Sequence, residues 1–204
     1  MIYDISMEIN PNIQTYKRDK SKSPVFKQTG SFEKNGVYET TLTIGLHTGT
    51  HVDYPLHMIE NGKSSDSEVL ENLIGPAKVF DLTHVNDSIG YEDIKNLDIQ
   101  ENDFVLFKTR NSFEEEFNFE FIFVNESAAN YLVKQKVRGV GIDSLGIERS
   151  QKGHPTHKIL LLNDSVIIEG LRLKAVDEGE YNLYCLPLKI ANTEASLARV
   201  ILIK

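Results

Sequence analysis

The sequence contains few of the residues and runs that mark several common protein classes. It has one cysteine, Cys185, and no tryptophan in 204 residues. A lone cysteine cannot form a disulfide within the chain, so a disulfide-stabilised scaffold is excluded and a reducing, cytoplasmic compartment is predicted. No apolar run approaches the length of a membrane-spanning helix, and the opening MIYDISMEIN lacks the pattern of a signal peptide.

Positive charge is also scarce. The chain carries 22 basic and 30 acidic residues, a net charge of −8. A nucleic-acid-binding protein needs a basic surface to meet the phosphate backbone, so nucleic acid is not the expected partner. A small-molecule substrate is compatible with this charge. The length and the 40% hydrophobic content predict one domain, residues 1–204, with a substantial core.

Short runs of strand-favouring residues outnumber helical patterns along the chain. Strands are predicted at residues 37–44, 77–83, 103–109, 138–143, 165–171, 182–188 and 198–204, and helices at residues 91–97, 125–137 and 157–163. Residues 16–24 are charged and rich in Lys and Ser, which predicts an exposed loop. Strands and helices do not alternate strictly, so the pattern indicates a mixed α/β fold rather than a doubly wound sheet.

Half of the six histidines fall within the eleven residues HTGTHVDYPLH, residues 47–57. Thr and Gly between His47 and His51 disfavour a helix, and so does Pro55, so the cluster is predicted to lie on a compact loop after a strand. His51 and Asp53 are two residues apart, the alternation of an extended segment, so both can point to one side.

Two imidazoles and one carboxylate form the ligand set of a catalytic metal site that keeps one position open. His57 could be a fourth ligand, or it could stand beside the metal as an acid or base. A hydrogen-bonded polar network is the alternative to a metal site. The motifs H-E-x-x-H, C-x-x-C and G-x-S-x-G are absent, which excludes zincins, cysteine zinc sites and the serine hydrolase elbow.

HTGTHVDYPLH resembles the H-x-G-T-H-x-D-x-P-x-H signature of the cyclase family of metal-dependent hydrolases, which includes bacterial kynurenine formamidases and isatin hydrolases. Every fixed position is matched. The resemblance continues in order through Gly141-Ile142-Asp143, a histidine in PTHKILLLN, a glutamate in VIIEGL and the segment Leu186 to Lys189. It implies a mixed α/β domain around a strand-rich, twisted, barrel-like sheet with flanking helices, and a homodimer or larger homo-oligomer.

The resemblance also implies roles for individual residues. Ligands of one or two divalent ions, with zinc favoured over manganese, would be His47, His51, Asp53, His157 and Glu169. Asp53 would bridge the two ions. His57 would be the catalytic acid/base, while a metal-bound hydroxide attacks the carbonyl of the substrate.

The implied reaction is hydrolysis of the amide bond of a small aryl formamide similar to N-formylkynurenine. The alternatives are hydrolysis of a cyclic amide or lactone, as by an isatin hydrolase, and a metal-binding protein without catalysis. His57 favours an enzyme, because a pure binding site needs no proton donor. The Trp-Pro-Gly-Asp stretch common in kynurenine formamidases is missing, and Tyr54 stands where the family often has alanine. Tyr16 and Phe26 are candidates to replace the missing stacking surface.

Two further polar residues in the C-terminal half are predicted to serve other purposes. Asp143 is expected to be a structural carboxylate, and His154 a loop residue that lines the pocket.

Overall fold

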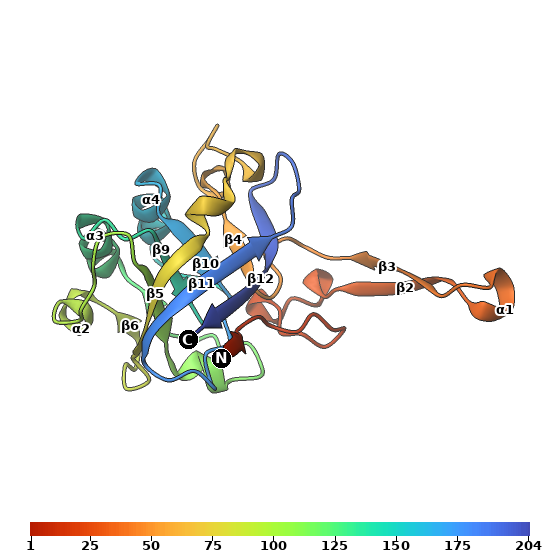
Figure 1. Cartoon of the computed structure of the whole chain (residues 1–204), viewed down its shortest axis with the longest axis horizontal. Helices are drawn as coiled ribbons and strands as arrows, with labels where there is room; N and C mark the ends of the chain where they lie inside the picture. The colour runs from red at the N-terminus through yellow and green to blue at the C-terminus, as the bar shows by residue number, and fades with distance from the viewer.

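In the computed structural model, which describes residues 1–204, seven strands pair edge to edge into a closed ring (Figure 1). Their order around the ring is β12, β11, β5, β7, β9, β10 and β4, and β4 pairs with β12 to close it. The strands from β5 to β10 run parallel, whereas β4, β11 and β12 pair antiparallel to their neighbours. The predicted mixed α/β, barrel-like fold is confirmed.

The strands of the ring are short, and the longest lie near the C-terminus. Their bounds are β4 His51–Asp53, β5 Ile74–Asp81, β7 Phe104–Lys108, β9 Gly139–Ile142, β10 Val166–Glu169, β11 Gly179–Pro187 and β12 Ala195–Ile203. Strand β1, Ile2–Asp4, adds to the edge of β12. Two small sheets lie outside the ring: β2 Val25–Gly30 with β3 Glu39–Thr43, and β6 Ser88–Ile89 with β8 Phe123–Val124.

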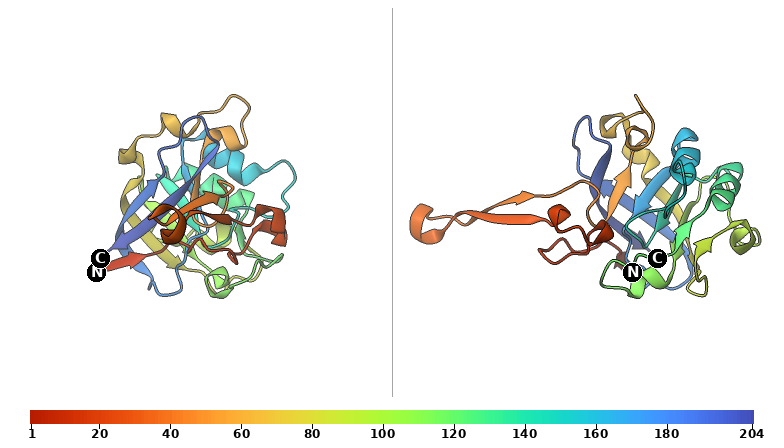
Figure 2. Two further views of the ribbon diagram at one scale, coloured as in Figure 1. Left: turned by 90° about the vertical axis from the view of Figure 1, so that its right-hand side faces the viewer. Right: turned by 180° about the vertical axis from the view of Figure 1, so that it is seen from behind.

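Three of the four helices gather on one side of the ring, opposite the β2–β3 hairpin, and the fourth, α1, lies at the tip of that hairpin (Figures 1 and 2). Their bounds are α1 Phe32–Asn35, α2 Tyr91–Ile94, α3 Glu126–Lys134 and α4 Pro155–Leu162. Helix α3 begins where the Asn125 side chain accepts hydrogen bonds from the backbone N–H groups of Ser127 and Ala128, as is usual for an asparagine at a helix N-cap. Helix α4 packs against α3 and β10.

Strand β7 shows how the sequence builds two cores. Its side chains alternate, so Phe104 and Leu106 fill the interior of the ring while Val105 and Phe107 face the helices. Because both faces are buried, the strand is apolar throughout, as is usual for parallel strands covered by helices. The same alternation governs the strands that carry the candidate site.

The β2–β3 hairpin extends away from the rest of the molecule and carries α1 at its tip (Figures 1 and 2). Helix α1 is capped at its C-terminus by Gly36, which adopts a left-handed conformation with φ of 71°. Large apolar side chains of the hairpin are exposed: Val25, Phe26, Phe32, Val37, Tyr38 and Leu42. An isolated two-stranded hairpin is only marginally stable in water, so this segment lacks the packing partner that it needs.

One part of the sequence-based prediction is wrong. The cluster at residues 47–57 does not lie on a single loop, because His51 and Asp53 form strand β4 inside the closed ring. Strand β4 has only three residues, which is too short for a recognisable strand pattern. The inference that His51 and Asp53 share a side, which rested on alternation, is confirmed by their common contacts described below.

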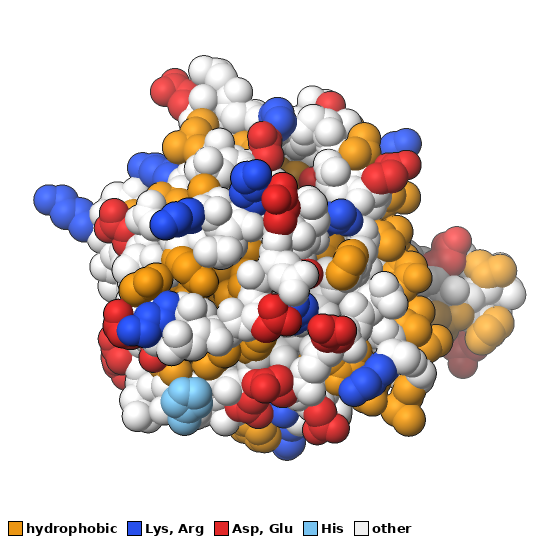
Figure 3. Space-filling view, turned by 60° about the vertical axis from the view of Figure 1, so that its left-hand side comes forward, with side chains coloured by type: hydrophobic (Ala, Val, Ile, Leu, Met, Phe, Trp, Pro, Cys, Tyr) orange, Lys and Arg blue, Asp and Glu red, His pale blue; other side chains and the backbone are white.

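The helix-covered face carries acidic and basic side chains that are interspersed, with hydrophobic groups between them (Figure 3). This face therefore has no extended area of one charge. None of the helices has the length and apolar character required to traverse a lipid bilayer.

Candidate metal centre

Strand β4 places two polar side chains on the outer face of the ring. Val52 and Tyr54 point into the interior core, so the alternate residues His51 and Asp53 point outwards. Both side chains are nevertheless fully buried, because α4 and the turn before β4 cover that face. Strand pairing on both sides fixes the backbone of β4 and therefore the direction of these two side chains.

The neighbouring strand β10 contributes a carboxylate at the same level. Glu169 pairs directly with His51 in the antiparallel register, and its Oε2 lies 3.4 Å from His51 Nε2. Its other oxygen, Oε1, accepts a hydrogen bond of 2.6 Å from the backbone N–H of Ile147. Two strands that are far apart in sequence thus present one imidazole and two carboxylates side by side.

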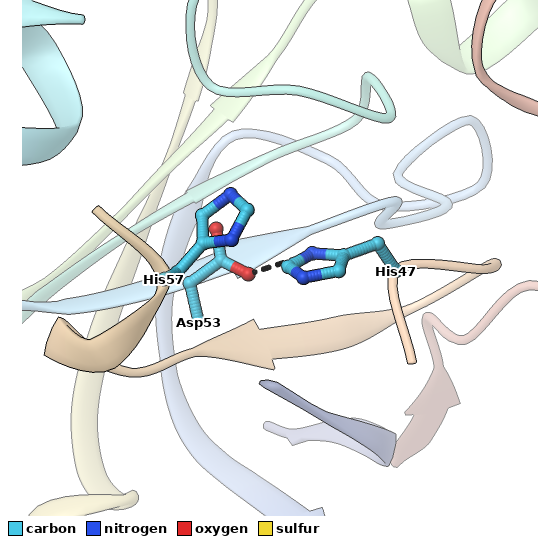
Figure 4. Close-up of side chains that lie close together, drawn as sticks. All are labelled: His47, Asp53 and His57. Atoms are coloured by element: carbon cyan, nitrogen blue, oxygen red, sulfur yellow. Dashed lines mark ion pairs between the residues drawn. The ribbon is translucent and has the colours of Figure 1, made fainter. Parts of the chain in front are cut away.

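Three histidines approach from segments outside the ring. His47 belongs to the turn before β4, His57 to the short 3-10 helix η3 (Pro55–His57) and His157 to α4. Figure 4 shows His47 and His57 pointing towards Asp53 from two directions. The rings of His47 and His57 are 4.2 Å apart between centroids, and those of His57 and His157 are 5.6 Å apart. All six predicted site residues therefore meet in one place.

The first set of atoms has the spacing of metal ligands. His47 Nδ1 lies 3.2 Å from His51 Nε2 and 3.2 Å from Asp53 Oδ1, and His51 Nε2 lies 3.5 Å from that oxygen. Ligands that surround zinc tetrahedrally at about 2.0–2.1 Å stand roughly 3.3 Å from one another. The three atoms therefore suit one face of a tetrahedral site.

A second set shares Asp53 with the first. His157 Nε2 lies 3.6 Å from Asp53 Oδ2 and 3.4 Å from Glu169 Oε1. The two oxygens of Asp53 thus face different sets of atoms. This is the position of a carboxylate that could bridge two cations.

The surroundings of the Asp53 carboxylate test whether a cation fits between these side chains. Both of its oxygens are buried and neither accepts a hydrogen bond in good geometry, although the imidazoles of His47 and His157 are near. A buried carboxylate without hydrogen bonds is costly unless a positive charge compensates for it. The donor set of imidazoles and carboxylates suits a divalent metal ion.

Without a metal, protons on the imidazoles supply that positive charge. Burial lowers the pKa of His51, but Glu169 and Asp53 outweigh burial and raise the pKa to about 9. Burial also opposes protonation of His157, yet Asp53, Glu148 and Glu169 raise its pKa to about 12. Burial and Asp53 favour the neutral acid of Glu169, but His157 and His51 lower its pKa to about 2. Two imidazolium ions therefore face three buried carboxylates, those of Asp53, Glu148 and Glu169.

Zinc binding should consequently release protons. A metal ion needs the lone pairs of neutral imidazoles, and His51 and His157 both have a raised pKa, so they are protonated at pH 7.5. We expect roughly two protons per chain to be released when zinc binds to the metal-free protein. The apparent affinity for zinc should rise as the pH is raised towards about 9, the pKa of His51. Calorimetric titration with zinc in buffers of different ionisation enthalpy measures the number of protons released. Zinc binding without proton release would contradict these protonation states.

Two glycines allow the backbone around His51 to pack closely. Gly49 adopts φ of 68°, which allows a tight turn, and its carbonyl lies 2.9 Å from His51 Nδ1. Gly170 follows Glu169 with φ of 69°, and a Cβ at this position would lie 2.8 Å from the carbonyl carbon of Gly49. Thr50 also donates a hydrogen bond of 2.6 Å to the carbonyl of Gly170. Gly170 is thus required for the contact that holds the His51 turn.

Gly170→Ala should destabilise both the fold and the metal centre. The added methyl group collides with the Gly49 carbonyl and also meets an unfavourable positive φ, so we expect a loss of about 3 kcal/mol in the free energy of unfolding and weaker zinc binding. Gly36→Ala is the matched control, because its φ is 71° but no atom lies near the added methyl group. It should cost about 1 kcal/mol and leave zinc binding unchanged. Urea unfolding and zinc titration of both variants test this; equal losses would contradict the close-contact argument.

His57 has the character of a neutral imidazole beside the cluster. Burial lowers its pKa from the usual value, and this outweighs the opposite effect of Asp53, while His47 and His157 act in the same direction as burial. The ring makes no ion pair with a carboxylate, in contrast to His47, His51 and His157. It is therefore available to accept a proton near neutral pH.

The cluster opens into a cavity of about 580 Å³. Its walls are partly apolar, with Ile44, Leu46, Met58 and Leu145, and Tyr16 stands at one side. Tyr16 is thus in the predicted position. Phe26 does not line the cavity, although Val25 and Thr43 of the same hairpin do, so the stacking role predicted for Phe26 has no support within one chain.

Sequence reasoning missed two carboxylates that contact the predicted site residues. One is Glu148, which is buried with its Oε1 3.0 Å from His157 Nδ1. It follows the buried Ile147 in LGIERS, and a glutamate at the end of an apolar run was the available signal. The other is Glu194, whose Oε1 lies 3.4 Å from His47 Nε2. His154 lines the cavity, as predicted.

Asp143, by contrast, belongs to the scaffold. It accepts hydrogen bonds from the backbone and hydroxyl of Thr109, from the amide of Asn111, and from the backbone and hydroxyl of Ser112. These bonds tie the end of β7 to the end of β9. The predicted structural role of this carboxylate is confirmed.

The Cyclase family model matches residues 3–149, which include β4 and the whole HTGTHVDYPLH segment. The chain is a member of the Cyclase family. Its match to the kynurenine formamidase of Erythrobacter litoralis (strain HTCC2594) is 33% identical and covers 98% of this chain and 93% of the relative. That alignment extends past residue 149 to the parts of this Cyclase-family chain that carry His157 and Glu169.

Solved structures share this architecture. One, described as "Potential Metal-Dependent Hydrolase With Cyclase Activity", is 52% identical with a TM-score of 0.92, covering 99% of this chain and 96% of the other. Isatin hydrolase A from Labrenzia aggregata has the same fold, with a TM-score of 0.87 at 22% identity, covering 99% of this chain and 93% of the other. Together with the His/Asp/Glu cluster, these likenesses identify a metal-dependent hydrolase.

Proposed function

We propose that the protein holds one or two divalent metal ions between five side chains. His47, His51 and Asp53 bind the first ion, and Asp53, His157 and Glu169 bind the second. The observation that supports this proposal best is that neither oxygen of Asp53 accepts a hydrogen bond, while Oδ1 faces His47 and Oδ2 faces His157. Zinc is the preferred ion, because imidazole and carboxylate ligands bind it more tightly than manganese, which is the second choice.

The proposed reaction is hydrolysis of the amide bond of a small aryl formamide, which yields an aryl amine and formate. A divalent ion supplies a Lewis acid that polarises the carbonyl and makes water nucleophilic near neutral pH. The cavity of about 580 Å³ is of a size for a small-molecule substrate, and its apolar wall suits an aromatic ring. The relatives named kynurenine formamidase support this bond type.

His57 is the proposed catalytic acid/base. It enters the reaction neutral, accepts a proton from the attacking water and returns it to the nitrogen that leaves. Its burial keeps it neutral, and its position against His47 and Asp53 puts it beside the reacting atoms. A site that only stored metal would have no use for this residue, which argues against a non-catalytic protein.

The experiment that tests the substrate compares N-formylkynurenine with isatin on protein stripped of metal and reloaded with zinc or manganese. Faster turnover of N-formylkynurenine is the expected result. Isatin hydrolysis without formamide hydrolysis would replace the proposal with its alternative, a cyclic amide or lactone hydrolase. That alternative is kept because Tyr54 and the lack of tryptophan depart from the kynurenine formamidase pattern. No turnover of either substrate would overturn both.

We also propose that the protein is a homodimer in which the hairpin of each subunit packs on the other. The support is the exposed apolar surface of the hairpin, where Phe32 is 73% and Tyr38 is 60% exposed. A location in the cytoplasm is proposed as well, in keeping with a single buried cysteine.

A charge on the hairpin should dissociate the dimer. Light scattering is expected to give twice the chain mass of 23.1 kDa for the wild type, and the chain mass for Phe32→Asp combined with Tyr38→Asp. The control is Phe113→Asp, a similarly exposed ring on the body of the molecule, which should remain dimeric. A monomeric wild type would contradict the proposal.

A further inference from the structure

Beside the metal centre, one buried carboxylate contacts two imidazoles. Glu148 Oε1 lies 2.7 Å from His154 Nδ1, in hydrogen-bond geometry. It also lies 3.0 Å from His157 Nδ1, which is buried and makes no hydrogen bond in good geometry, so Glu148 is the acceptor within reach of that nitrogen. The side chain of Glu148 is 2% exposed, whereas that of His154 is 56% exposed. Both imidazoles line the cavity, and His157 Nε2 also lies 3.4 Å from Glu169 Oε1 in the candidate metal centre.

The second oxygen of Glu148 is fixed by the start of α4. Oε2 accepts hydrogen bonds of 2.9 Å from the backbone N–H of Thr156 and 3.0 Å from the side-chain amide of Gln151. Gln151 also donates to the hydroxyl of Thr156 at 2.7 Å. The carboxylate therefore cannot rotate away without leaving buried donors unpaired, which makes it a rigid acceptor for the two imidazoles.

We propose that Glu148 is a positioning residue that holds the protons of His154 and His157 on Nδ1, so that Nε2 of His157 is free to bind metal and Nε2 of His154 is a hydrogen-bond acceptor in the pocket. A ring nitrogen that donates to a carboxylate leaves the other nitrogen as the one with the lone pair. For His157, that other nitrogen already lies 3.6 Å from Asp53 and 3.4 Å from Glu169. Carboxylates in this position raise the affinity of histidine ligands for metals.

The orientation of the His154 ring in the cavity has a consequence for the substrate. Because Nδ1 of His154 is engaged by Glu148, its remaining polar atom accepts a hydrogen bond at the exposed edge of the ring. This suits a substrate with an N–H or ammonium group remote from the bond that is cleaved, an inference that rests on the proposed aryl formamide function. The backbone of His154 has φ of 55° and ψ of 55°, so its position is held despite an unfavourable conformation.

The first test is spectroscopic and uses the wild type. Long-range ¹H–¹⁵N correlation spectra of the zinc-loaded protein should show His154 protonated at Nδ1 and unprotonated at Nε2 at pH 8. The opposite tautomer would overturn the proposal without any variant.

The second test uses Glu148→Gln, because an amide has one acceptor oxygen where Glu148 uses two. Competition with a chromophoric chelator should show the weaker zinc ion bound about 10–100-fold less tightly, and the His154 tautomer should become mixed. Glu92→Gln, on the exposed side of α2, is the matched control and should bind zinc as the wild type does. Unchanged zinc affinity in Glu148→Gln would overturn the positioning role.

The third test concerns the acceptor in the pocket. Kynurenine binding to the zinc-loaded protein, measured by calorimetry, should weaken about tenfold in His154→Leu and stay unchanged in His84→Leu, an exposed histidine outside the pocket. Equal binding to wild type and His154→Leu, or no binding to wild type, would overturn the acceptor role. Failure of formamide turnover alone would reject the proposed function, while the zinc and tautomer results would still decide the role of Glu148.

Discussion

Asp53→Asn should lower the zinc content of the protein and largely remove its hydrolytic activity. Each oxygen of Asp53 faces a different set of ligand atoms, and both are buried without a hydrogen bond. An amide keeps one oxygen, loses the negative charge and puts an N–H₂ group where a cation should bind. We expect zinc to fall from two ions per chain to one or none, and kcat to drop by at least about 10³-fold.

The measurements for this variant are zinc per chain by mass spectrometry and turnover of the formamide in excess zinc. Asp164→Asn, an exposed aspartate after α4, is the control and should keep both properties. Circular dichroism establishes that Asp53→Asn is folded. A folded variant that retains two zinc ions and more than a tenth of wild-type kcat would show that Asp53 does not hold the metal.

His57→Gln should separate catalysis from metal binding. The residue lies against the cluster but makes no ion pair with its carboxylates, so zinc stoichiometry should stay at the wild-type value. Without the proton transfer, kcat should fall by about 10²–10⁴-fold while KM changes little. His84→Gln, far from the cavity, is the matched control and should be fully active.

The pH dependence gives His57 a further signature. The reaction begins with neutral His57, and burial lowers the pKa of this imidazole below its usual value of 6.5. Wild-type kcat should therefore stay constant as pH falls through 6.5 and decline only below the lowered pKa, where His57 becomes protonated. The residual activity of His57→Gln should lack that decline. An unchanged acid limb in the variant would assign the titration to another group.

The sequence was sufficient to nominate the members of the candidate metal site but not to predict their arrangement. The fixed positions of HTGTHVDYPLH pointed to His47, His51, Asp53 and His57 because imidazoles and a carboxylate at this density have few other uses. His157 and Glu169 were found only through the family resemblance. Taken alone, His157 looks like an ordinary helix residue and Glu169 like an ordinary surface residue. The closed ring brings them to β4 through pairings between strands more than 100 residues apart in the sequence.

Three features escaped the sequence for physical reasons. Strand β4 has three residues, so its period of two is too short to stand out, and only pairing on both sides makes it a strand. Glu148 lies in a segment without regular structure, and its role depends on contacts with α4. The projection of the β2–β3 hairpin could not be predicted, because its alternating residues look like those of any half-buried sheet.

The most direct test of the metal-dependent mechanism is turnover of N-formylkynurenine as zinc is added stepwise to the metal-free protein. Activity should be absent at the start, rise with each equivalent up to two per chain, and then remain constant. It should return to zero when a chelator removes the zinc. Full activity in the metal-free protein, unaffected by zinc or chelator, would contradict the assignment of the His/Asp/Glu cluster as a catalytic metal centre.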